Sequence, residues 1–92
     1  MANSLRSGQI TVTTATTAVQ GTDVRGKHFM VKALAGNGGL IYVGNDGAGD
    51  VTSANGHELS AGDSVPIYVA NLNEVYFDSA TSGDKFSWLR VG

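Results

Sequence analysis

The stretch SANGHELSAGDSVPIYVANL, residues 53–72, places turn residues between very short apolar runs. Asn-Gly at 55–56 and Ala-Gly-Asp at 61–63 are typical of tight turns, because glycine and asparagine tolerate a positive φ. Between and after these turns lie HELS at 57–60, a brief segment, and SVPIYVA at 64–70, which has the length of one short strand. We therefore predict a strand at 64–70, preceded by closely spaced turns.

The run at 64–70 also indicates its own position in a sheet. Alternation along a strand directs Val65, Ile67 and Val69 to one face. Pro66 points to the other face and has no backbone N–H, which restricts it to an edge strand. This segment is predicted to lie at a sheet edge with one buried face.

The same pattern extends along the whole chain of 92 residues, which contains 13 glycines and one proline. Strand candidates follow one another roughly every 8–12 residues, with turn residues between them and no apolar stripe of helical period. We predict an all-β fold: a compact antiparallel β-sandwich, jelly-roll-like, with about seven to eight short strands. A more closed barrel fits the same pattern.

Three further runs predict buried faces. Phe29, Val31 and Ala33 share one face of a strand at 28–34, and LIYVGN at 40–45 is apolar on both faces, as a central strand is. In the last run, at 85–91, one face carries Phe86, Trp88 and Arg90, and the other carries Ser87, Leu89 and Val91. Since this strand is apolar on both faces, we expect packing within the domain or a surface that a partner covers.

The chain divides into a polar segment at 1–9, expected to be a flexible or extended N-terminal arm, and a single β-sandwich domain at 10–92. It has no cysteine, so no disulfide stabilises so small a core. Small domains of this kind often gain stability from other subunits, and we expect self-association or docking to a larger body.

Charge and hydropathy make two classes of partner improbable. The formal net charge is −2, and the six basic residues are scattered rather than gathered in the stripe that a phosphate backbone requires. The apolar runs are far too short to span a bilayer. We therefore expect neither nucleic acid nor membrane as a partner.

Two patterns raise the question of a metal site. GNDGAGDV at 44–51 spaces Asp46 and Asp50 like oxygen ligands of calcium, but a single copy of such a loop and the missing EF-hand glutamate favour a hairpin turn. His28 and His57 are the only histidines, and a zinc site would need both together with carboxylates. We predict no metal site.

Catalytic motifs are missing as well. The sequence contains no G-x-S-x-G, no phosphate-binding glycine loop and no predicted helix N-terminus. Asp78 and Asp84 flank the last loop and are expected to be solvated there. We predict a protein that is not an enzyme and carries no cofactor.

Five segments, in this order and spacing, carry a family resemblance: VTT (12–14), VKALAGNGGLIYVG (31–44), SANGHELSAGDSV (53–65), NLNEVYFDS (71–79) and SGDKFSWL (82–89). Together they make the chain, from about residue 9 onward, resemble small virion structural proteins of tailed bacteriophages, of the capsid decoration (cement) or head-fibre kind. The resemblance concerns a scaffold, so no catalytic residues carry over from it.

The resemblance implies a structural protein made in the host cytoplasm that binds the outside of the capsid and stabilises the shell. Its expected partners are the major capsid protein and further copies of itself, in a homo-oligomer for which a trimer is favoured over a dimer. The contact surface is predicted to include Leu5 and Arg6 of the arm and Trp88 and Arg90 of the last strand.

Two other functions stay open. A tail- or fibre-associated module for host recognition would bind carbohydrate through an exposed aromatic platform. An enzyme or metal-dependent domain would need converging polar groups, for which the sequence gives no positive sign.

Overall fold

The computed structural model describes residues 5–45 and 51–92. Within these residues the chain forms eight strands and one short 3-10 helix. In chain order these are β1 (Arg6–Thr11), β2 (Val19–Gln20), β3 (Phe29–Ala33), β4 (Ile41–Gly44), β5 (His57–Leu59), β6 (Ser64–Ile67), η1 (Leu72–Glu74), β7 (Tyr76–Ser79) and β8 (Lys85–Arg90).

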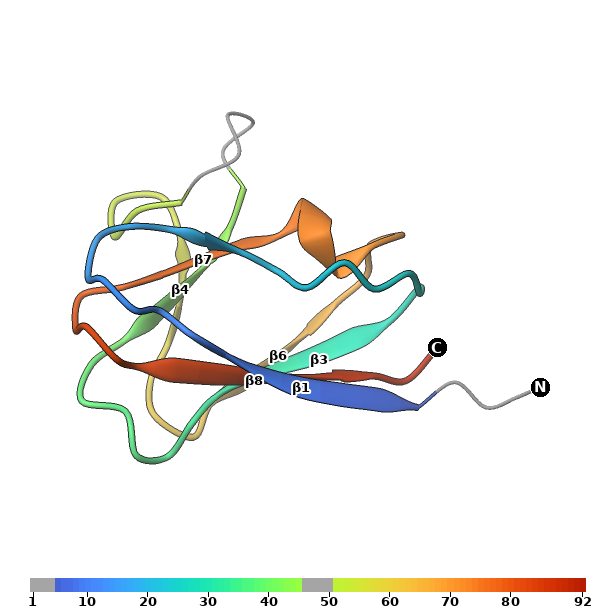
Figure 1. Cartoon of the computed structure of the whole chain (residues 1–92), viewed down its shortest axis with the longest axis horizontal. Helices are drawn as coiled ribbons and strands as arrows, with labels where there is room; N and C mark the ends of the chain where they lie inside the picture. The colour runs from blue at the N-terminus through green and yellow to red at the C-terminus, as the bar shows by residue number, and fades with distance from the viewer. Residues whose placement is uncertain (1–4, 46–50) are drawn as a thin grey trace.

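The strands form two four-stranded antiparallel sheets that stack face to face (Figure 1). The first sheet has the order β1-β8-β3-β6, and the second has the order β2-β7-β4-β5. The pairs β1–β8, β2–β7, β3–β6 and β4–β5 are nested, as if one long hairpin had been rolled over itself. This is the strand order of a jelly roll, so the predicted all-β sandwich is confirmed.

The core lies between the inner faces of the two sheets. Phe77 from the second sheet stacks on Phe86 from the first, with ring centroids 3.7 Å apart. Around this pair pack apolar side chains from both sheets and from the loops that cross between them: Val12, Val24, Phe29, Val31, Ala33, Ile41, Val43, Leu59, Leu72, Val75 and Trp88. The sandwich is therefore held by one continuous core rather than by crosslinks.

Several local predictions are confirmed. Phe29, Val31 and Ala33 are all buried on the inner face of β3. β4, apolar on both faces, lies between β7 and β5, and β6 with its proline is the edge strand of the first sheet. Gly62 and Gly83 lie in turns with φ of 88° and 89°, a conformation that favours glycine.

β1 begins at Arg6, so residues 6–9 of the segment expected as an arm are extended and pair with β8. Gly8 lies opposite Trp88 in this pairing. A Cβ at Gly8 would lie 2.8 Å from Nε1 of Trp88, so the missing side chain makes room for the indole. The close contact between β1 and β8 thus depends on this glycine.

The expectation that Asp78 and Asp84 are solvated is wrong, because both are buried. The Asp84 carboxylate accepts hydrogen bonds from the backbone N–H groups of Gly38 and Gly39, at 2.9 Å each, and from Oγ of Ser79 at 3.2 Å. It therefore joins two chain segments that cross between the sheets, 34–40 and 80–84. The sequence shows a carboxylate beside a turn, but not the loop that folds over it.

Candidate functional site

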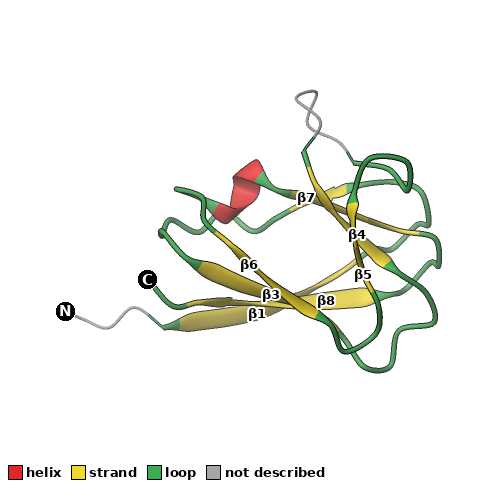
Figure 2. Cartoon of the chain, turned by 180° about the vertical axis from the view of Figure 1, so that it is seen from behind, coloured by secondary structure: helices red, strands yellow, loops and turns green. Residues whose placement is uncertain are grey.

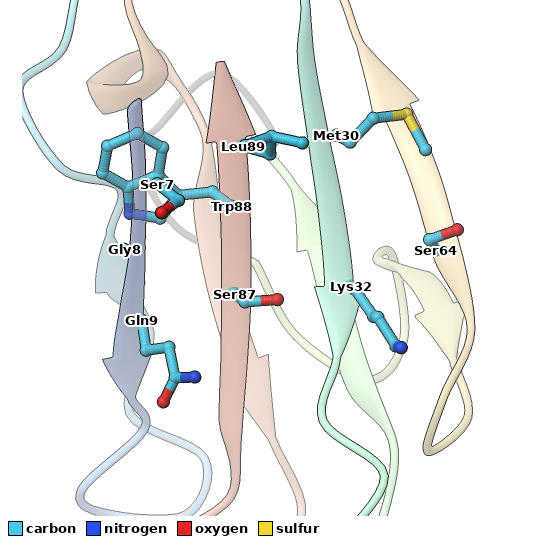
Figure 3. Close-up of a pocket in the computed structure, with 9 residues that line it drawn as sticks. All are labelled: Ser7, Gly8, Gln9, Met30, Lys32, Ser64, Ser87, Trp88 and Leu89. Atoms are coloured by element: carbon cyan, nitrogen blue, oxygen red, sulfur yellow. The ribbon is translucent and has the colours of Figure 1, made fainter. Parts of the chain in front are cut away.

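The outer face of the first sheet presents side chains from all four of its strands. The strand registers align them in two rows: Ser7, Leu89, Met30 and Pro66, followed by Gln9, Ser87, Lys32 and Ser64. Figure 3 shows Leu89, Met30, Lys32 and Ser64 projecting from neighbouring strands on this face. Nothing in the described chain packs over this face as the second sheet packs over the inner one (Figure 2).

A groove of about 460 Å³ runs across these strands. Its lining residues, all labelled in Figure 3, are Ser7, Gly8, Gln9, Met30, Lys32, Ser64, Ser87, Trp88 and Leu89. The serines on β1, β8 and β6 have small side chains, which leave room for the groove. The half-buried Met30 and Leu89 provide an apolar centre. The groove can therefore receive an apolar side chain and offers hydroxyl groups around it.

One end of this face carries an apolar patch, which we define as Leu5, Tyr68 and Val91. These three are the exposed large hydrophobic residues of the described chain, at 69%, 71% and 46% exposure. They lie directly before β1, after β6 and after β8, and the antiparallel registers bring these strand ends to one end of the sheet, at the right of Figure 1. Alternation directs them to the side of Ser7, Pro66 and Leu89, which is the outer face.

Two contacts connect the patch through His28, which precedes β3. The N–H of Val91 donates to the carbonyl of His28 at 2.9 Å. The ring of Tyr68 stacks on the imidazole of His28, with centroids 4.3 Å apart. The patch is thus built on sheet backbone and a stacked ring, and exposed apolar groups gathered in this way are typical of contact surfaces.

The structure separates the four residues predicted from the sequence. Leu5 belongs to the apolar patch, whereas Trp88 is 4% exposed and packs in the core. Arg6 is exposed, and its guanidinium carbon lies 6.0 Å from the centroid of the Trp88 ring. Arg90 is half-buried and donates from Nη1 to the carbonyl of Arg25 at 2.8 Å.

Arg6, Trp88 and Arg90 therefore lie close together. Their side chains are on the inner side of the first sheet, at the end where β1 begins and β8 ends. The indole of Trp88 is not presented at the surface of this domain, and a contact role for Leu5, Arg6 and Arg90 stays a prediction. Sequence reasoning missed Tyr68, although its position next to Ile67 in an alternating strand directs it outward. The alternation pattern did place Leu89 and Val91 on the opposite face of β8 from Phe86 and Trp88.

The described residues contain no group of three or more His, Cys, Asp or Glu side chains that could hold a metal ion. His28 adjoins the first sheet, whereas His57 lies on β5 of the second. Asp46 and Asp50, considered above for calcium, lie outside the described residues. Across residues 5–45 and 51–92, no helix is long and apolar enough to cross a membrane.

Comparison with known proteins gives no family: no family model, no curated protein and no solved structure matches this chain.

Proposed function

We propose that this chain is a non-enzymatic structural protein of a tailed-bacteriophage virion, which docks on the outside of the capsid and stabilises the shell. The observation that carries the proposal is the open outer face of the first sheet, with the apolar patch gathered at one end. The resemblance in the order of strand and turn segments supports the virion context.

The mechanism is physical rather than chemical. A rigid jelly roll places the apolar patch and the groove on one face, so docking costs little conformational entropy. Each copy buries apolar surface that is available only on the assembled lattice, and many copies add their modest contacts across the shell. A docked layer thereby raises the free energy needed to separate neighbouring capsid subunits.

Self-association is part of the same proposal, with a trimer favoured over a dimer. β1 is an edge strand of six residues without proline, whereas the edge strand β6 contains Pro66, and β2 and β5 have two and three residues. Long edge strands without proline are the ones that pair with other chains. β1 is therefore the strand through which copies would join, and light scattering after size-exclusion chromatography measures the copy number.

Two measurements test the docking role. The first counts copies of this chain per major capsid subunit in purified particles by quantitative mass spectrometry, for which we expect a ratio near one or within a few-fold of it. The second compares shell binding of the wild type with a Tyr68→Ser and Val91→Ser double variant, using His57→Ala on the second sheet as control. Absence from the particle, or equal binding by all three proteins, would refute the proposal.

A second candidate, a carbohydrate-binding module of a tail or fibre, is favoured by one observation. Tyr68 presents an exposed ring that stacks on His28 beside a small hollow formed with Gly26, Lys27 and Ala70. The other six aromatic residues are buried or half-buried, so Tyr68 would act alone. Glycan-array binding that disappears in Tyr68→Ser would favour this candidate over capsid docking.

A further inference from the structure

Charge is divided between the two sheets. The strands of the first sheet carry Arg6, Lys32, Lys85 and Arg90 and no acidic residue, whereas those of the second sheet carry Glu58 and Asp78 and neither lysine nor arginine. All eight strands lie within the described residues. The chain as a whole has a formal net charge of −2, so the basic character of the first sheet is a local property.

Two of these cations lie on the open outer face. Lys32 pairs in register with Ser87 and Ser64, which places it at the end of the groove (Figure 3). Lys85 alternates with Ser87 on β8, so it points to the same side, and both lysines are exposed. The face therefore bears two ammonium groups set in serine and threonine rather than among carboxylates.

Two acidic residues directly precede strands of the first sheet, and their carboxylates bind backbone N–H groups. Asp63 precedes β6 and accepts the N–H of Ser60 at 3.1 Å through Oδ2. Asp84 precedes β8 and is buried under the backbone of Gly38 and Gly39. Within the described part of the chain, neither carboxylate forms an ion pair with Lys32 or Lys85.

The lysines and the apolar patch mark opposite ends of the face. Val91 and Lys85 are six positions apart along β8, a separation of about 20 Å in an extended strand. A partner that covers the whole face must match both ends at once. This distance gives the contact a direction, because a partner turned by 180° would place its apolar groups against the lysines.

We infer that the surface covering the first sheet is an acidic protein surface, with carboxylates opposite Lys32 and Lys85 and apolar side chains about 13 to 20 Å away, opposite Tyr68 and Val91. This inference rests on the proposed function and specifies the chemistry of the capsid site. Exposed charges of this kind contribute mainly to orientation and association rate, while the apolar patch contributes most of the affinity. A nucleic acid is disfavoured, because Met30 and Leu89 occupy the centre of the face where a phosphate backbone would need cations.

The first experiment needs no particle. Poly-L-glutamate is titrated into 15N-labelled protein at low salt, with poly-L-lysine and a 12-base-pair DNA duplex in parallel. We expect amide shifts around Lys32, Lys85 and Ser87, none on β5 or β7, and loss of these shifts in a Lys32→Glu and Lys85→Glu double variant. Because the chain is net negative, general attraction to a polyanion would not give this pattern.

The second experiment measures binding to purified shells that lack this chain. Lys32→Glu is compared with Arg25→Glu, which changes the net charge equally at an exposed residue of the β2–β3 loop. We expect at least about tenfold weaker binding for the first variant, little change for the second, and a wild-type affinity that falls with salt.

The outcomes separate the two proposals. Wild-type binding that both variants retain overturns the acidic-surface inference and leaves capsid docking standing. Failure of the wild type to bind shells refutes capsid docking, and the poly-L-glutamate titration then decides the inference alone. Stronger and equally localised shifts with DNA than with poly-L-glutamate would overturn it in favour of a nucleic acid.

Discussion

The two sheets of this sandwich differ in what lies on their outer faces. On the second sheet, Tyr42 and Asp78 alternate with core residues and so point outward, yet both are buried. Part of the cover comes from residues 51–56: a Cβ at Gly56 would lie 2.7 Å from Cβ of Tyr42 and from the side chain of Val51. The first sheet has Met30 and Leu89 in comparable positions, and its face stays open as a groove.

The outer faces of the two sheets therefore differ in whether a segment of the same chain covers them. The chain uses a loop of its own to complete the second sheet, and the strands on that side are short. The first sheet has the two six-residue strands, β1 and β8, and no described residue packs over its outer face in this way. The exposed apolar residues on this face support the proposal that a partner covers it.

The largest expected effect concerns the core that both sheets share. Phe86→Ala removes the stack with Phe77 and should lower the free energy of unfolding by about 4 kcal/mol. Chemical denaturation measures this change, with Ser87→Ala on the outer face as control. A loss below 1 kcal/mol would mean that the sheets do not depend on this contact.

The next effect concerns the crossings between the sheets. Asp84→Ala leaves the N–H groups of Gly38 and Gly39 without their acceptor and should cost about 3 kcal/mol. Asp63→Ala, in an exposed turn, is the control and should cost much less. Equal losses in the two variants would contradict the structural role assigned to the buried carboxylate.

A smaller effect tests the covered face of the second sheet. Gly56→Ala places a methyl group against Tyr42 and Val51 and should destabilise the fold by about 2 kcal/mol. A Cβ at Gly36 meets nothing within 4 Å, so Gly36→Ala is a matched control with little expected loss. If the thermal midpoints of the two variants coincide, the loop at 51–56 does not pack as described.

The smallest effect on stability belongs to the open face. Val91→Ser should lower the free energy of unfolding by less than about 0.5 kcal/mol, because exposed side chains contribute little to folding. Tyr68→Ser also removes the stack on His28 and should lower it by about 1 kcal/mol. The main cost of both variants should appear in shell binding. A large loss of stability would show that the patch serves the fold rather than a partner.

Much of this fold follows from local patterns in the sequence. Alternation separated the two faces of β3 and of β8, Pro66 identified an edge strand, and the glycine of Ala-Gly-Asp at 61–63 identified a turn. The nested pairing does not follow from such patterns, because it joins residues as distant as Arg6 and Arg90. Local alternation defines the two faces of each strand, but it does not determine which strands pair with each other.

The candidate site was harder to predict for the same reason. Trp88 was grouped correctly with Phe86, but only the position of β8 between β1 and β3 shows that its indole is enclosed. Tyr68 and Val91 are far apart in the sequence, and each of them contacts His28. Which face stays open depends on where the loop at 51–56 packs, and this is a tertiary property.

The central claim is that the outer face of the first sheet is covered by a partner in the particle. Lysine footprinting tests it most directly, by comparing the acetylation of Lys32 and Lys85 in free protein and in purified particles. We expect rapid acetylation of both lysines in the free protein and strong protection of both in the particle. Equal reactivity in the two states would contradict it.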